Sequence, residues 1–140
     1  MAAKEYNAEI GILAPSEEND VERQNELLKE AIEKKPDAIL FSPSSFTESD
    51  ALLKEAKEDG IRIGFIDSYT KEAIQDLTVA TDNLEAGEKL GKFAATLLGP
   101  EDQIAVVAHV KGVSTAVERE EGFRKRSRKT GRQYRGSGVL

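Results

Sequence analysis

A chain of 140 residues, 39% hydrophobic and 33% charged, is long enough for one domain with an aliphatic core. It contains no cysteine, which excludes disulfide and thiolate chemistry, and no apolar run near the roughly 20 residues that a membrane helix needs. The formal net charge of −6 argues against nucleic acid as a ligand of the chain as a whole.

Short apolar runs alternate with segments of helical periodicity along the chain. The apolar runs predict strands over Ala8–Leu13, Ala38–Phe41, Ile61–Ile66, Leu77–Ala80 and Gln103–Val110. The periodic segments predict helices from Asn19 or Asp20 to Lys35, from Thr47 to Gly60, from Asp82 or Asn83 to Leu98, and from Ser114 to Phe123. This alternation indicates an α/β fold, a Rossmann-like parallel sheet flanked by helices.

The helix after Asp82 carries two glycines, Gly87 and Gly91, one turn apart on its apolar face. Each glycine inside a helix costs roughly 1 kcal/mol relative to alanine. A compensating contact is therefore expected, and we predict that the helix approaches the sheet closely at these positions.

Ligands of open parallel sheets meet the loops at the carboxyl ends of the strands. Asp67 directly follows the apolar run I-G-F-I, so its carboxylate would lie at this edge of the sheet. There it can accept hydrogen bonds from vicinal hydroxyls or bind a cation. The alternative is that Asp67 only begins a turn. The loops over 42–46 and 67–69 add Ser42 and Ser68 as candidate ligand residues.

Arg119 is a further candidate, because its guanidinium fork matches hydroxyl, carbonyl or carboxylate oxygens; a solvated surface arginine is the alternative. His109 has no second histidine and no cysteine to accompany it, so we expect no metal site. The glycine motifs of phosphate and dinucleotide sites are missing, and we expect no cofactor and no catalysis.

Four segments occur in an order that resembles type I periplasmic sugar-binding proteins of the ribose-binding group, which share their fold with the effector core of the lactose-repressor family. They are D-V-E-R-Q-N-E-L-L-K-E-A-I-E-K-K-P-D-A-I-L-F-S-P, I-R-I-G-F-I-D-S, V-A-T-D-N-L-E-A-G and G-V-S-T-A-V-E-R-E-E-G-F. The resemblance implies that Asp67 and Arg119 correspond to the family's sugar-binding aspartate and arginine. Ser68 stands where ribose binders often carry arginine, which leaves the particular sugar open.

The resemblance also implies an incomplete type I periplasmic-binding-protein fold. Residues 1–100 would form a partial first lobe without its first strand, residues 101–125 the first βα unit of the second lobe, and residues 126–140 a basic tail that is non-native or disordered. The family's sheet order is 2-1-3-4-5, so the strand at Ala8–Leu13 would pair directly with Ala38–Phe41 or borrow a strand from another chain. Exposed sheet edges would favour self-association.

The function that the resemblance implies is sugar binding for an ABC transporter, with the loaded protein presented to the membrane subunits. Because the cleft would be incomplete, we expect weak or no sugar binding. The alternatives are the effector-binding domain of a lactose-repressor-type regulator and a small receiver- or flavodoxin-like domain that uses Asp67. As written, the N-terminus lacks the apolar segment of a secretory signal, which predicts a cytoplasmic chain, whereas the parent protein would be extracytoplasmic, periplasmic or lipid-anchored.

The charge is divided unevenly along the chain. Residues 1–123 carry 13 basic and 26 acidic side chains, and residues 124–140 carry seven basic and no acidic ones. A one-nucleotide shift of the reading frame from Arg126 allows G-L-E-K-x-E-D-N-I-E-V-V-G-Y, which would continue a helix, a turn and a strand. We therefore interpret the basic tail as a product of a frameshift rather than as a nucleic-acid-binding arm; a stop codon in the shifted frame would refute this interpretation.

Overall fold

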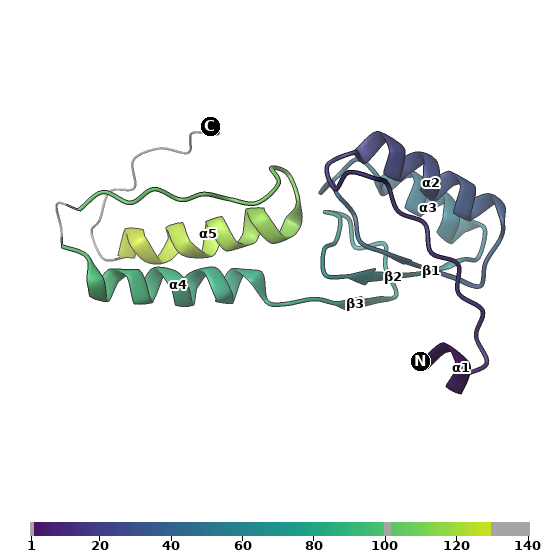
Figure 1. Ribbon diagram of the computed structural model, residues 1–140, viewed down its shortest axis with the longest axis horizontal. Helices are drawn as coiled ribbons and strands as arrows, with labels where there is room; N and C mark the ends of the chain where they lie inside the picture. The colour runs from purple at the N-terminus through teal and green to yellow at the C-terminus, as the bar shows by residue number, and fades with distance from the viewer. Residues whose placement is uncertain (1, 100–101, 130–140) are drawn as a thin grey trace.

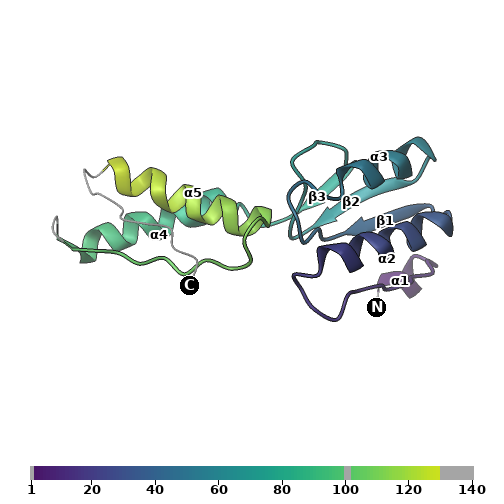
Figure 2. The ribbon, with the colours of Figure 1, turned by 90° about the horizontal axis from the view of Figure 1, so that it is seen from above.

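Three parallel strands and the helices around them form an α/β unit, and two further helices pack against each other beyond it (Figure 1, Figure 2). The computed structural model describes residues 2–99 and 102–129. In chain order the elements are α1 (Ala2–Glu5), α2 (Val21–Glu33), β1 (Ala38–Phe41), α3 (Asp50–Glu58), β2 (Arg62–Ile66), β3 (Leu77–Val79), α4 (Asn83–Leu97) and α5 (Ser114–Lys129). The expected fold class, a parallel sheet flanked by helices, is confirmed.

The sheet has the strand order β1-β2-β3, and both pairs are parallel. Its register places Ile39 beside Ile63 and Phe41 beside Phe65. These four side chains are at most 8% exposed, because α2 and α3 cover that face of the sheet (Figure 1). Since side chains alternate between the two faces of a strand, residues of the other parity point away from these helices. Leu40, Leu77 and Val79 on that second face are 59–66% exposed.

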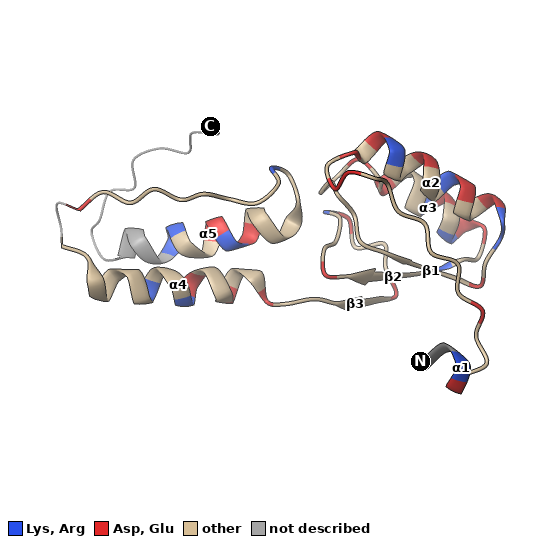
Figure 3. Cartoon of the chain, in the orientation of Figure 1, with Lys and Arg blue, Asp and Glu red and all other residues tan. Residues whose placement is uncertain are grey.

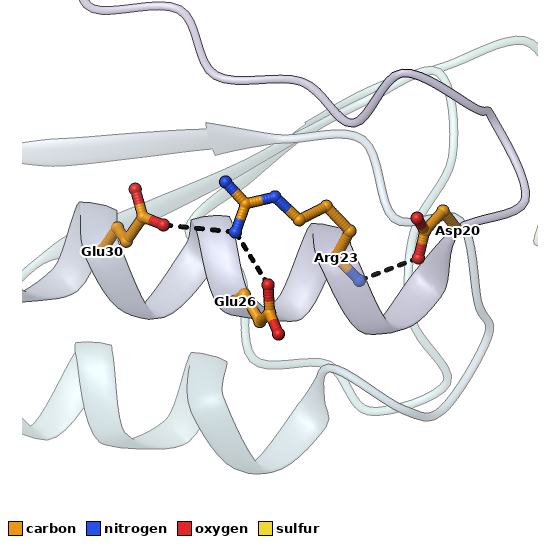
Figure 4. A network of polar contacts seen from close by, with 4 residues as sticks. All are labelled: Asp20, Arg23, Glu26 and Glu30. Atoms are coloured by element: carbon orange, nitrogen blue, oxygen red, sulfur yellow. Dashed lines mark hydrogen bonds and ion pairs between the residues drawn. The ribbon is translucent and has the colours of Figure 1, made fainter.

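The sequence predicts that α2 begins at Asn19 or Asp20, and the cap residue is Asp20. The Asp20 carboxylate accepts a hydrogen bond of 2.9 Å from the Arg23 backbone N–H, which satisfies one of the unpaired amides of the first turn (Figure 4). The Arg23 guanidinium pairs with Glu26 at 2.7 Å and Glu30 at 3.4 Å along the solvent-facing side of the helix. Acidic and basic residues are interspersed along α2 and α3 (Figure 3).

The loop between β2 and β3 is held at its far end by Asp76. Its carboxylate accepts hydrogen bonds from the Ile63 N–H at 2.9 Å and from the Lys57 ammonium at 3.0 Å. These two contacts, the backbone one first, lower the pKa of Asp76. The Lys57 ammonium also donates to the Ile74 carbonyl at 2.5 Å. The loop that begins at Asp67 is therefore anchored to the start of β2 and to α3.

Two predicted strands are wrong, although both segments are apolar. Residues Ala8–Leu13 are exposed and unpaired, with Ile12 86% exposed, and Gln103–Val110 has no strand either, with Val107 93% exposed. A strand needs a neighbour to take up its backbone hydrogen bonds, and neither segment finds one among the described residues. The sequence-based expectation that Ala8–Leu13 pairs directly with β1 is therefore not met.

Helices α4 and α5 pack in parallel, and glycines bring their backbones together. A Cβ added to Gly87 would collide with the Arg119 carbonyl, and one added to Gly122 would collide with the Leu84 carbonyl. Side chains larger than hydrogen are excluded at both points, so each glycine is required by the contact. The close contact that compensates for Gly87 is therefore made with helix α5. The prediction that α4 approaches the sheet closely at this position is wrong.

Helix α5 extends beyond the predicted end at Phe123. It runs to Lys129, so residues 126–129, which were expected to belong to a non-native or disordered tail, are helical. Extending an existing helix adds a hydrogen bond per residue without a new nucleation cost. The remainder of the predicted basic tail, residues 130–140, lies outside the described residues.

Candidate functional site

Asp67 lies at the carboxyl end of β2, as the sequence predicts, in a left-handed backbone conformation. Its φ is +65°, its N–H donates to the Val79 carbonyl at 2.9 Å, and its side chain is exposed. Aspartate tolerates positive φ better than most residues. The bond to Val79 holds the turn against the neighbouring strand, and the exposed carboxylate lies at the carboxyl end of β2.

Ser42 and Ser68 are brought together from the loops after β1 and β2. Their hydroxyl oxygens are 3.1 Å apart, and the Ser68 hydroxyl donates to the Pro43 carbonyl at 2.9 Å. Since Ser68 has only one proton to donate, Ser42 is the donor in the pair. Ser68 is 3% exposed, so it serves to tie the two loops together, and Ser42 is the more accessible of the two.

Tyr69 connects the α/β unit to α5. Its N–H donates to the Ser114 hydroxyl at 3.1 Å, and its own hydroxyl donates to the Glu118 carboxylate. Its ring meets Phe46 edge to face, with centroids 6.1 Å apart. The Phe46 N–H in turn donates to the Gly112 carbonyl at 2.8 Å, so two loops of the α/β unit hold the segment that leads into α5.

Burial, followed by the hydrogen bond to Glu118, raises the pKa of Tyr69 to about 12. A folded pKa above the unfolded value of about 10 means that this contact stabilises the fold fully below about pH 10 and is lost as the pH rises toward 12. Replacing Glu118 with glutamine should lower the pKa of Tyr69, because a negative neighbour is removed, while burial keeps it above 10. Ultraviolet titration of tyrosinate, with Tyr69→Phe to assign the transition, checks this; an unchanged transition in Glu118→Gln would show that Glu118 does not act on Tyr69.

Arg119 is anchored by Asn83, the first residue of α4. The Arg119 Nε donates to the Asn83 amide oxygen at 2.8 Å, and the Asn83 amide nitrogen donates to the Thr81 carbonyl at 3.1 Å. Asn83 is fully buried, and Arg119 is exposed as a residue. Sequence reasoning treated Asn83 only as a helix cap; the cap is Asp82, whose carboxylate accepts from the Glu85 N–H at 2.8 Å.

The predicted site residues therefore divide between two bodies. Asp67, Ser42 and Ser68 belong to the α/β unit, and Arg119 belongs to the helix pair. The Tyr69–Glu118 bond joins the two groups, since Tyr69 is two residues from Asp67 and Glu118 is adjacent to Arg119. Among the described residues no direct bond links Asp67 to Arg119. Sequence reasoning missed Tyr69, Glu118 and Asn83, whose roles depend on contacts between segments far apart in the chain.

A separate hollow lies at the opposite, amino ends of the strands. Its lining comes from the loops that enter β1 and β2 and includes Lys35, Asp37, Asp59 and Arg62. These are exposed charged residues of the turns between helix and strand. The rule that ligands bind at the carboxyl ends of parallel strands places this hollow away from the candidate site.

His109 pairs with Glu18, with 3.0 Å between its Nε2 and the carboxylate. No group of three or more histidine, aspartate or glutamate side chains within residues 2–99 and 102–129 is arranged to hold a metal ion. In the same part of the chain, none of the helices combines the length and the apolar character needed to cross a membrane.

The fold is a Rossmann-like α/β unit with parallel strands, joined by a short linker to a pair of helices, and polar side chains lie where the two parts meet. The chain belongs to the periplasmic binding protein domain family, whose model matches residues 1–137.

Individual proteins support this assignment. The chain is 28% identical over 106 residues to the ribose import binding protein RbsB of Bacillus subtilis, a match that covers 76% of this chain and 35% of that protein. The crystal structure of a sugar transporter from Clostridium phytofermentans is similar with a TM-score of 0.84 and 42% identity, over 89% of this chain and 46% of that one. The chain spans less than half the length of both relatives.

A third similar structure is an ABC transporter solute-binding protein from Agrobacterium vitis with bound D-fucose. Its TM-score is 0.85 at 29% identity, over 95% of this chain and 47% of that one. None of the matches named here supports the regulator or the receiver-like alternative.

Proposed function

We propose that this chain carries part of the sugar site of a solute-binding component of an ABC transporter, and that it binds without catalysis. The observation that carries the proposal is the exposed Asp67 carboxylate at the carboxyl end of β2, beside the contact between the two bodies. A carboxylate accepts hydrogen bonds from two neighbouring sugar hydroxyls, and the fork of Arg119 donates to sugar oxygens. The names of the relatives, a ribose importer and a D-fucose-bound solute-binding protein, support a sugar ligand.

In the whole protein the two bodies would be the beginnings of two lobes that close on the sugar, and the loaded protein would be presented to membrane subunits outside the cytoplasm. The packing of α4 on α5 supports a boundary between the lobes at residues 80–82, earlier than the division near residue 100 that the sequence suggested. Both Asn83 and Arg119 would then belong to the second lobe.

The site is tested by a nuclear magnetic resonance titration with D-ribose and D-fucose. We expect shifts of the backbone amides around Asp67 and Arg119, with affinities weaker than about 1 mM, or less than about 4 kcal/mol of binding free energy. In Asp67→Asn, which also tolerates positive φ, these shifts should disappear. An open-chain polyol at equal concentration is the control. Equal shifts with the polyol, or shifts confined to the amino ends of the strands, would contradict the proposal.

We further propose that copies of the chain associate through the free edge of β1. Leu40 on this strand is 66% exposed, and β1 has no second neighbour among the described strands. Unpaired strand edges with apolar side chains favour pairing between chains, and a lysine on the edge opposes it. Sedimentation velocity should show concentration-dependent dimers that Leu40→Lys reduces. Leu90→Lys, at a site on α4 that is 59% exposed, is the matched control; equal effects of the two variants, or a monomer at all concentrations, would contradict edge pairing.

A further inference from the structure

Asn83 is a fully buried amide that is placed to orient a charged side chain at the edge of the candidate site. Both ends of its amide are used: the nitrogen donates to the Thr81 carbonyl at 3.1 Å, and the oxygen accepts from the Arg119 Nε at 2.8 Å. The first bond fixes the orientation of the amide, because it determines which end is the nitrogen. The oxygen is thereby directed at α5.

The close approach of the two helices puts Asn83 within reach of Arg119. Gly87 stands one turn after Asn83 on the same face of α4, and the position of its absent Cβ lies 3.0 Å from the Arg119 Cα. A larger residue at Gly87 would push the Arg119 backbone away from α4. The glycine and the asparagine thus act on the same residue of α5, one on its backbone and the other on its side chain.

The contact uses only one of the five N–H groups of the guanidinium. Nε is bonded to Asn83, and within residues 2–99 and 102–129 no other hydrogen bond of this side chain is found. The two terminal nitrogens, which present a planar pair of donors, are left for a partner. An arginine fixed at Nε loses less side-chain freedom when it binds than a free one does.

We propose that Asn83 is a positioning residue, which holds Arg119 so that its terminal nitrogens meet the oxygens of a bound sugar. This rests on the proposed function for the identity of the ligand. The positioning itself rests on the 2.8 Å contact, the burial of Asn83 and the glycine beside it.

The test compares wild type, Asn83→Ala and Asn83→Asp by nuclear magnetic resonance of the arginine Nε–H groups, with Arg119→Lys to assign the signal. In Asn83→Ala, the Arg119 Nε–H should exchange with water faster by on the order of tenfold, as expected on losing a hydrogen bond to a charged group. The chemical shift of Arg119 changes with D-ribose concentration, and the initial slope of this change should fall at least about fivefold, because the donors are no longer held in one orientation. Asn83→Asp keeps an acceptor oxygen and should retain both properties.

Two outcomes would overturn the inference. One is an Arg119 Nε–H that is unchanged in Asn83→Ala, and the other is a changed Nε–H with an unchanged sugar response. Unaltered amide shifts in the parts of α4 and α5 away from residue 83 identify variants whose helix pair remains folded. If Asn83→Ala does not fold, Asn83→Leu, which keeps the side-chain volume but not the acceptor oxygen, should speed the exchange as well. If wild type shows no sugar shifts at all, the proposed function fails and with it the ligand part of the inference, while the exchange rates still decide whether Asn83 orients Arg119.

Discussion

Gly122→Ala is expected to separate α4 from α5 and to unfold the helix pair while the sheet stays intact. The new methyl group would meet the Leu84 carbonyl oxygen and come within 2.9 Å of the Glu88 backbone nitrogen. These are backbone atoms, which cannot rotate away as a side chain can. Alanine gains roughly 1 kcal/mol of helix propensity over glycine, but overpacking costs about 1–3 kcal/mol or more. The clash therefore outweighs the gain, and the net effect is destabilising.

Amide hydrogen exchange measures this effect in each body separately. In Gly122→Ala the protection of α4 and α5 should be lost, and the protection of β2 should be retained. Gly11→Ala is the control, because nothing lies within 4 Å of the added Cβ and the backbone there has no positive φ. Helices as well protected in Gly122→Ala as in wild type would show that the close helix contact does not exist in solution.

Phe65→Ala is expected to remove a large part of the stability of the α/β unit. Phe65 is 1% exposed at the centre of a cluster that includes Leu53, Ile63 and Phe41. Truncating a buried phenylalanine costs about 3–5 kcal/mol, from lost burial and from the cavity that remains. A unit of this size has about 5–10 kcal/mol of stability, so the variant should lose about a third of it or more.

Chemical denaturation followed by circular dichroism gives the loss in unfolding free energy. Leu77→Ala is the matched control, since Leu77 lies on the opposite face of the sheet and is 59% exposed. Its replacement should change the stability by about 0.5 kcal/mol or less, as for most surface positions. Comparable losses for Phe65→Ala and Leu77→Ala would mean that both faces of the sheet are covered in solution.

The sequence predicts most local elements of the α/β unit, because local signals determine them; the exception is α3, which begins at Asp50, three residues after the predicted start at Thr47. β1 has the predicted bounds, and β2 and β3 differ by one residue at one end. Each helix cap is one of the two residues predicted for it, Asp20 for α2 and Asp82 for α4. In each case the signal lies within a few residues: an apolar run, or a carboxylate that accepts from the N–H three residues later.

Features that depend on contacts between distant segments of the chain could not be predicted in the same way. Apolar runs predicted strands at Ala8–Leu13 and Gln103–Val110, but a run carries no information on whether a neighbouring strand is present. For Gly87, the sequence predicted a close contact but not the element that makes it. The Tyr69–Glu118 and Asn83–Arg119 bonds join residues 49 and 36 positions apart, and nothing in the local sequence indicates them.

Calorimetric titration of the chain with D-ribose and D-fucose tests the central claim, that this chain presents only part of a sugar site. We expect no binding tighter than about 1 mM, because Asp67 and Arg119 lie on two bodies joined by a few hydrogen bonds and the chain spans less than half of its relatives. Micromolar binding of either sugar, abolished in Asp67→Asn, would contradict it, since a partial site could not supply that affinity.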